Sequence, residues 1–223
     1  MLLARDLITD TVPSVKTSDS ATRVLEWMSE FKVYHLPVVN NEKLLGIIGE
    51  QDLLEADIED GPIGSLRLSL PEQTYVHEDS HFYDILKMSS IMKLDVLPVL
   101  GVRDNAYIGA ITKADLLTKA AAFLNVEEPG GVIVLSVSVN SYSISEIGRI
   151  CESNDAKILS LSVSNAHEVG KLHVTLKLNI RELSRVVSTF ERFEYEIALV
   201  VFDAEQLDDY KERYENLLRY LNL

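Results

Sequence analysis

Two seven-residue segments of the sequence carry polar residues suited to binding a sugar or a phosphate at the start of a helix. They are residues 46–52 (GIIGEQD) and residues 109–115 (GAITKAD), and each follows an apolar, strand-like run. The first amides of a helix have no intrahelical partner and carry partial positive charge, so an anion or a hydroxyl placed there finds hydrogen-bond donors. In the second segment Thr112 adds a hydroxyl, and Asp115, one turn later, can accept from two sugar hydroxyls.

The spacing of Thr112 and Asp115 has a second interpretation that needs no ligand. It resembles a capping box, in which a hydroxyl and an acidic side chain three residues later satisfy free amides, with Asp in place of the usual Glu or Gln. Such caps are common at helix starts. The two interpretations are compatible, because a capped helix start can still face a ligand.

The two segments belong to an internal repeat that organises the first half of the chain. The runs at residues 36–39 (LPVV) and 97–100 (LPVL) are 61 residues apart (97 − 36). The aspartates Asp52 and Asp115 are 63 apart (115 − 52), so the two additional residues lie in the turn between the strands of the second copy. A Gly-Pro-Ile-Gly break then separates two copies, which we expect at residues 1–61 and 62–126.

Hydrophobic periodicity predicts the same elements in both copies. Each copy has an amphipathic helix, a β-hairpin of two apolar strands and a closing helix. The expected elements are, in order, a helix at residues 21–31, a hairpin turn at 40–43, a helix at 52–58, a helix at 81–92, hairpin strands at 95–100 and 107–111, and a helix at 116–124.

Both copies resemble the core of a CBS domain, whose signature is a Leu-Pro-Val-Val strand, a hairpin, a Gly-hydrophobic-hydrophobic-Thr/Ser-x-x-Asp segment and a helix. The resemblance implies a compact pair with two clefts that often bind adenosine-containing ligands, the aspartate holding the ribose. The second copy keeps Thr112 and Asp115, whereas the first keeps Asp52 but has Gly49 at the Thr/Ser position, so we expect binding mainly in the second cleft. The implied nucleotide-binding residues are Thr112, Asp115, Lys113, Gly109, Ile111, Asp52 and His35.

The same resemblance places a basic residue near the ligand phosphates, just before the Leu-Pro-Val run. His35 stands there in the first copy and Val96 in the second, which weakens the expected grip of the second cleft on phosphate. In one interpretation Lys113 or Arg103 compensates. In the other, each is a solvated surface charge, as most lone charges are.

Composition bounds the compartment and the partners. The chain has 223 residues, 47% of them hydrophobic, which suffices for two domains with a sizeable core. A formal net charge of −14 argues against nucleic acid and anionic membranes as partners, since both attract basic patches. The one cysteine, Cys151, permits no disulfide within the chain and favours a reducing cytoplasm. We expect no signal sequence, no membrane span and no metal site.

A Pro-Gly-Gly boundary at residues 129–131 ends the repeats, and we expect a linker at residues 127–131. Beyond it, periodicity predicts a β-α-β-β-α-β order, the pattern of ferredoxin-like folds, over residues 132–203. The expected elements are a strand at residues 132–139, a helix at 145–153, strands at 158–164 and 173–178, a helix at 181–193 and a strand at 195–202.

This order resembles the ACT domain, a module that often pairs edge to edge and binds amino acids. The family's ligand loop reads Asp-x-Pro-Gly-x-Leu after the first strand, and here residues 140–145 read NSYSIS. Losing the glycine matters, because backbone close to a ligand needs the room that glycine gives. The resemblance implies Asn140, Ser143 and Ile144 as amino-acid-binding residues. A structural or dimerising role of the domain is favoured over amino-acid binding.

The last segment, residues 204–223, has the pattern of an amphipathic helix. Its apolar residues recur at spacings of three and four. Such a helix either docks on its own domain or pairs across a dimer. The apolar positions are Leu207, Tyr210, Tyr214, Leu217 and Leu221.

We therefore expect an α+β chain, with tandem CBS repeats followed by a ferredoxin-like ACT-like domain and a C-terminal helix. The arrangement is similar to the acetoin-utilisation accessory protein B family. No motif of a phosphate loop, zinc protease or serine hydrolase is present, so we expect no catalytic residues and no enzyme. The predicted function is a cytoplasmic, homodimeric regulator that needs no cofactor and senses AMP, ADP, ATP or S-adenosylmethionine. The alternatives are a constitutive dimeric scaffold without a nucleotide, or an amino-acid sensor.

Overall fold

The computed structural model describes residues 2–56, 61–66 and 74–202. The chain divides into two compact units, Met1–Ala120 and Ala121–Leu223, and each is described by itself. The expected helix at residues 204–223 lies outside the described residues. Within the part of the chain that is described, no helix is long and apolar enough to cross a membrane.

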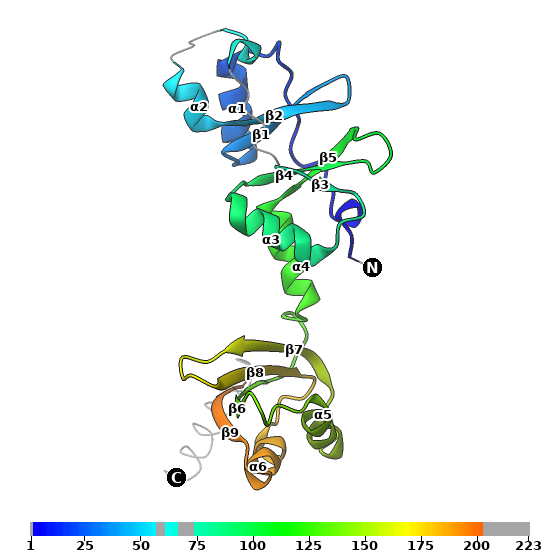
Figure 1. The fold of residues 1–223 in the computed structure, drawn as a ribbon, viewed down its shortest axis with the longest axis vertical. Coiled ribbons are helices and arrows are strands. Elements are labelled where there is room, and N and C mark those ends of the chain that lie inside the picture. Colours follow the sequence, from blue (N-terminus) through cyan, green and yellow to red (C-terminus); the bar gives the residue numbers. More distant parts are fainter. Residues whose placement is uncertain (1, 57–60, 67–73, 203–223) are drawn as a thin grey trace, which may run out of the picture. The chain divides into compact units, whose positions relative to one another are not determined.

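The first unit contains the two copies of the repeat, and both fold into a helix, a β-hairpin and a second helix (Figure 1). A short 3₁₀ helix precedes the first α-helix of each copy: η1 precedes α1, and η2 precedes α3. The elements are η1 (Ala4–Asp6), α1 (Ala21–Phe31), β1 (His35–Asn40), β2 (Lys43–Gly49), α2 (Glu50–Glu55), η2 (Ile63–Ser65), β3 (Val76–His77), α3 (Phe82–Met92), β4 (Val96–Leu100), β5 (Tyr107–Thr112) and α4 (Lys113–Phe123).

Local signals explain where these elements begin and end. The Ser20 side chain caps α1 by accepting a hydrogen bond from the Arg23 amide, and α1 ends at Lys32 in the left-handed region. The turn between β1 and β2 uses two residues with positive φ, Asn41 (48°) and Glu42 (62°). Positive φ at both positions is the geometry of the two-residue turn whose twist suits a hairpin. The helix, hairpin turn and paired strands predicted for the first copy are therefore found.

The leading segment of each copy packs on the other copy. Near the N-terminus, the Ala4 amide donates to the Ser80 carbonyl at 2.9 Å and Leu7 is buried in the core of the second copy. In the same way Ile63, which follows the break between the copies, is buried in the core of the first. The Ile63 amide donates to the Asp19 carbonyl at 2.9 Å. Each copy therefore completes its core with chain from outside its own repeat.

The second unit is a four-stranded antiparallel sheet with two helices. The strand order is β7-β8-β6-β9, and Figure 1 shows both helices on the same face. Its core combines Ile133 and Leu135 of the central strand with Ile147 and Phe190 of the two helices. The elements are β6 (Val132–Ser138), α5 (Ile144–Ser153), β7 (Ile158–Asn165), β8 (Lys171–Leu178), α6 (Ser184–Arg192) and β9 (Glu196–Val201).

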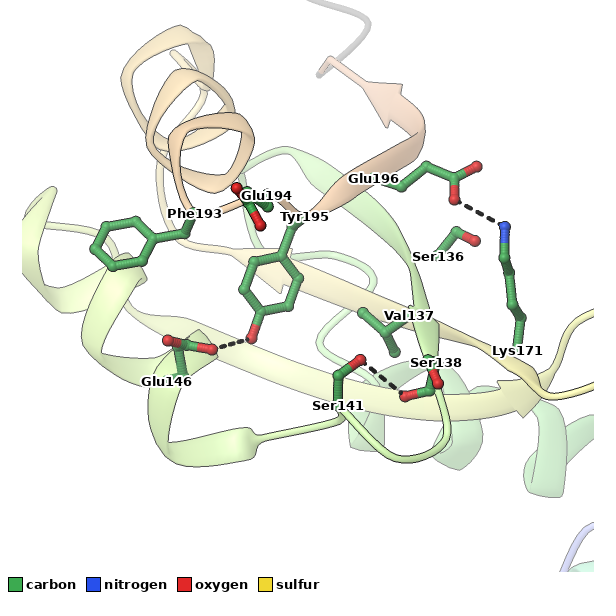
Figure 2. Close-up of a pocket in the computed structure, with 10 residues that line it drawn as sticks. All are labelled: Ser136, Val137, Ser138, Ser141, Glu146, Lys171, Phe193, Glu194, Tyr195 and Glu196. Carbon is green, nitrogen blue, oxygen red and sulfur yellow. Dashed lines mark hydrogen bonds and ion pairs between the residues drawn. The ribbon is translucent and has the colours of Figure 1, made fainter.

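Two polar contacts lie at the N-terminal end of β9, where the chain arrives from α6 (Figure 2). One joins this end of the chain to α5, and the other joins two strands of the sheet. The Tyr195 hydroxyl donates to Glu146 at 2.8 Å, and burial together with this contact raises the pKa of Tyr195 to about 12. Lys171 pairs with Glu196 at 3.0 Å across the sheet. Cys151 is buried in the core, as expected of a small apolar filler, and burial raises the pKa of its thiol to about 11.

Three predicted helix starts were wrong. The helices expected from residues 52 and 116 begin earlier, at Glu50 and Lys113, because they follow their strands without any intervening loop. The helix expected from residue 181 begins only at Ser184, whose amide is held by the Glu182 carboxylate at 2.9 Å. The predicted end of the first of these helices, at residues 57–58, lies outside the described residues.

Replacing either of two glycines of the second unit with alanine should change its stability, in opposite directions. Gly130 has a φ of +148°, and a Cβ there would lie 1.9 Å from the Leu178 carbonyl oxygen. Gly130→Ala should therefore destabilise the unit by about 2–4 kcal/mol, through backbone strain and steric overlap. Gly148, in α5, has open space around it, so Gly148→Ala should stabilise by about 0.5–1 kcal/mol. Urea unfolding followed by circular dichroism checks both, and effects of equal sign would contradict the packing described.

Candidate functional site

The two polar segments singled out in the sequence lie where the second hairpin strand of each copy runs directly into a helix. The Glu50 amide, at the start of α2, donates to the Tyr34 carbonyl at 2.9 Å. In the second copy the Lys113 amide, at the start of α4, donates to the Asp95 carbonyl at 2.8 Å. Tyr34 and Asp95 are 61 residues apart (95 − 34), so the same backbone contact forms the helix start in both copies.

In the second copy one half of the predicted cap is present, and the Asp115 carboxylate accepts from hydroxyls instead of a backbone amide. The Asp115 amide donates to the Thr112 hydroxyl at 3.1 Å, and that hydroxyl donates to Oδ2 of Asp115. A second hydroxyl, from Thr9, donates to the same oxygen at 2.7 Å. Thr9 was not predicted, because it stands 106 residues from Asp115 in the chain. The packing of the N-terminal segment on the second copy brings the two residues together.

In the first copy the equivalent aspartate has a backbone partner instead. The Gly49 amide donates to Oδ2 of Asp52 at 2.9 Å. A Cβ on Gly49 would lie 3.1 Å from that oxygen and 3.5 Å from Cδ2 of His35. The first copy therefore lacks the hydroxyl of the second at a place that directly adjoins Asp52 and His35.

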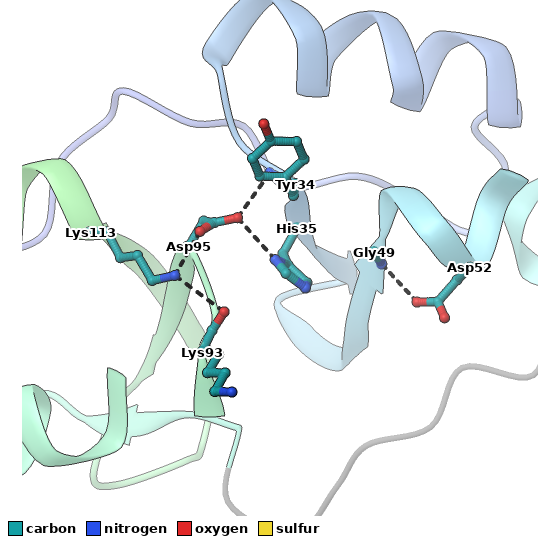
Figure 3. Close-up of polar contacts among 7 residues, drawn as sticks. All are labelled: Tyr34, His35, Gly49, Asp52, Lys93, Asp95 and Lys113. Carbon is teal, nitrogen blue, oxygen red and sulfur yellow. Dashed lines mark hydrogen bonds and ion pairs between the residues drawn. The ribbon is translucent and has the colours of Figure 1, made fainter. Parts of the chain in front are cut away.

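Asp95 joins the two copies (Figure 3). One carboxylate oxygen accepts from the Tyr34 amide at 3.1 Å and lies 3.2 Å from Nδ1 of His35. The other oxygen accepts from Nζ of Lys113 at 2.8 Å, and Lys113 also donates to the Lys93 carbonyl at 3.2 Å. Burial alone would raise the pKa of Asp95, but the hydrogen bonds from Lys113, His35 and the Tyr34 amide outweigh it and hold that pKa below its usual value.

Two cavities lie beside Asp95, and each takes its walls from both copies. The first, of about 430 Å³, pairs the start of α2 with chain that follows α3. The second, of about 380 Å³, pairs the start of α4 with chain that follows α1. Among the predicted residues, His35 and Asp52 line the first cavity, and Thr112, Lys113 and Asp115 line the second.

Two predicted residues have evident structural roles. Ile111 is 2% exposed and packs in the core of the second copy. Gly109 has a φ of +153°, and a Cβ there would lie 2.4 Å from Cγ2 of Ile8. The close approach of the N-terminal segment therefore explains this glycine, and neither residue is among those that line the two cavities.

Several residues that line the cavities were not predicted. Lys32 and Lys93 occupy equivalent positions 61 apart, each just after a helix and each in the left-handed region. Lys93 lines the first cavity, Lys32 the second, and Tyr34 and Asp95 line both. Comparing the two copies position by position around His35 and Val96 would have drawn attention to Asp95.

Two residues of the loop predicted for amino-acid binding in the second unit form local hydrogen bonds. The Ser143 hydroxyl caps α5 by accepting from the Glu146 amide at 3.4 Å, and the Asn140 amide donates to the Ser138 hydroxyl at 3.4 Å. Ile144 is 58% exposed. A nearby cavity of about 350 Å³ is lined by other residues, among them Ser136, Ser138, Ser141, Lys171 and Tyr195 (Figure 2). The described residues contain no cluster of three or more His, Cys, Asp or Glu suited to a metal ion.

Comparison with known proteins finds a family match in the first copy and similar solved structures. Residues 4–59 match the family model of the CBS domain. The chain is similar to a CBS domain pair/ACT domain protein from Thermotoga maritima, at 22% identity over 54% of this chain and 98% of that chain, with a TM-score of 0.48. It is similar to a Vibrio cholerae protein assigned to acetoin utilization, AcuB, at 25% identity over 57% and 96%, with a TM-score of 0.48. The CBS-pair protein CBSX2 from Arabidopsis thaliana matches at 23% identity over 54% and 95%, with a TM-score of 0.45.

The contacts of Asp95 predict how stability depends on pH. Because its folded pKa lies below the unfolded value, its contribution is present above about pH 4 and is lost as the pH falls through the folded pKa. Asp95→Asn should cost about 1–3 kcal/mol at pH 7, since hydrogen bonds to a charged group are lost. Urea unfolding should show the difference from the wild type narrowing as the pH is lowered to about 3.

The matched control is Asp104→Asn, which removes one exposed carboxylate from the turn between β4 and β5, where it accepts from the Ala106 amide. An asparagine oxygen can accept the same bond, so this variant should stay within about 0.5 kcal/mol of the wild type. A difference between the wild type and Asp95→Asn that is constant across the pH range would contradict the charged contacts assigned to Asp95.

Proposed function

We propose that this chain is a non-catalytic regulatory protein that senses an adenosine-containing ligand in a CBS pair and passes the signal through an ACT-like association domain. The family match at residues 4–59 supports a CBS domain in the first copy. The same elements and the same helix-start contacts recur in the second copy, which supports a pair. The observation that carries the proposal is the second cavity, where Thr112 and Asp115 stand at a helix start.

The side chains of this cavity suit the parts of an adenosine. Thr9 and Thr112 both donate to Oδ2 of Asp115, which fixes the carboxylate and leaves Oδ1 for a ribose hydroxyl. Phe31 and Val12 supply apolar surface for a planar base. A site of a few fixed polar groups in a largely apolar wall is the usual form of a small-molecule site.

The walls of the cavity also suit a ligand that changes how the two copies are arranged. Because each cavity is built from a helix start of one copy and the chain after a helix of the other, a ligand touches both copies at once. A ligand shifts an equilibrium between two arrangements only by its difference in affinity for them. If the separation of the copies differs between two arrangements, a ligand that bridges the copies would bind one arrangement more tightly than the other.

For the second unit we propose an ACT-like domain that pairs two copies of the chain. The order β-α-β-β-α-β with strand order β7-β8-β6-β9 supports a ferredoxin-like topology. Strands β7 and β9 stand at the sheet edges, where unpaired backbone groups favour addition of another strand. A CBS pair with an ACT-like domain is also the combination expected of the acetoin-utilisation accessory protein B family. The compartment proposed for this chain is the cytoplasm.

A constitutive dimeric scaffold that binds no nucleotide is the second candidate. Two observations favour it: the first copy has Gly49 in place of a hydroxyl, and Asp115 already has two hydroxyl donors from the chain itself. Amino-acid sensing is a third candidate and has less support, since Ser143 is engaged in capping α5.

Calorimetric titration with AMP, ADP, ATP, S-adenosylmethionine and adenosine tests the proposed site. At least one should bind saturably, and Asp115→Asn should weaken binding about tenfold or more, because a ribose hydroxyl loses a charged acceptor. Asp104→Asn is the matched control and should bind as the wild type does, since Asp104 lines neither cavity. The absence of heat with every ligand, in a protein shown by circular dichroism to be folded, would favour the scaffold.

A further inference from the structure

The carboxylate of Asp95 lies where the two cavities adjoin, and it lines both of them. It lines the first together with His35 and the second together with Lys113. Its side chain is 20% exposed, so solvent screens it only in part. Any ligand that fills either cavity therefore meets the field of this carboxylate.

Asp95 also engages the lysine and the histidine that are best placed to meet a phosphate. Lys113 is the first residue of α4, where helix amides favour an anion, but its Nζ lies 2.8 Å from Oδ1 of Asp95. His35 stands at the start of β1, and its Nδ1 lies 3.2 Å from Oδ2. A phosphate entering either cavity would have to compete with a fixed carboxylate for these donors.

The remaining charges of the cavities do not offset this effect. The first cavity is lined by three carboxylates, Glu50, Asp52 and Asp95, against one lysine, Lys93. The second is lined by Asp95 and Asp115 against Lys32 and Lys113, so its formal charges only cancel. The chain as a whole carries −14, which adds an unfavourable field for any anion.

We propose that Asp95 determines the charge specificity of both cavities, which favour an adenosine-containing ligand whose other end is uncharged or positively charged over AMP, ADP or ATP. The inference rests on the proposed function, because it presupposes that adenosine binds. Adenosine and a sulfonium nucleoside such as S-adenosylmethionine belong to the favoured class. A phosphate monoester, with a charge of about −1.5 to −2 at pH 7, belongs to the disfavoured one.

Adenosine and AMP form the matched pair of probes, since they differ only in the phosphate. In the full-length wild type, adenosine should bind about tenfold tighter than AMP, a ratio that one like-charge contact near a protein surface can supply. In Asp95→Asn the affinity for AMP should rise about tenfold, while that for adenosine changes by less than about twofold. Asp104→Asn, which removes the same charge outside the cavities, should leave the wild-type ratio unchanged.

Ionic strength gives a second test that needs no variant. Salt screens repulsion, so raising NaCl from about 50 mM to about 500 mM should increase the affinity for AMP relative to that for adenosine. If AMP binds at least as tightly as adenosine and loses affinity with salt, the charge assignment to Asp95 is overturned while the proposed function stands. If neither probe binds to the folded wild type, the proposed function fails and this inference fails with it.

Discussion

The contact on which the first unit depends is the carboxylate of Asp95 meeting the backbone amide of Tyr34. Tyr34 and Asp95 hold the same position in the two copies, so this contact lies where the repeats face one another. His35 and Lys113 complete it, one from each copy. A partly buried carboxylate is tolerated only where donors surround it, and here three donors do so. The two copies are thus joined by a charged group as well as by apolar surface.

The exchange of leading segments makes both cavities products of the whole unit. Leu7 and Ile63 are fully or nearly fully buried, and each lies in the core of the copy to which it does not itself belong. The N-terminal segment that carries Leu7 also carries Thr9, which holds Asp115. Core packing and the candidate ribose contact therefore depend on the same stretch of chain. A change in how the copies pack would be felt directly at Asp115.

Much of the fold was predictable from local patterns, whereas the contacts that join distant segments were not. The helix at Ala21–Phe31 and the turn at residues 40–43 follow from periodicity and short polar loops. Helix starts at Glu50 and Lys113 were placed too late, because apolar periodicity begins only after the capping residues. Asp115 was singled out by its spacing from Thr112 and by the resemblance to the CBS signature, and its nucleotide-binding role stays a prediction. The contacts of Thr9 and Asp95 depend on tertiary packing, for which a single sequence gives no local signal.

Hydrogen–deuterium exchange with and without saturating adenosine tests the central claim most directly, since it reports where a ligand protects the backbone. Binding in a cleft shared by both copies predicts slower exchange at residues 31–34 and 112–115 together, because these segments line the same cavity from opposite copies. Exchange at residues 136–141 of the second unit should be unaffected by direct contact. Protection confined to residues 136–141, or to one copy of the repeat alone, would contradict the account.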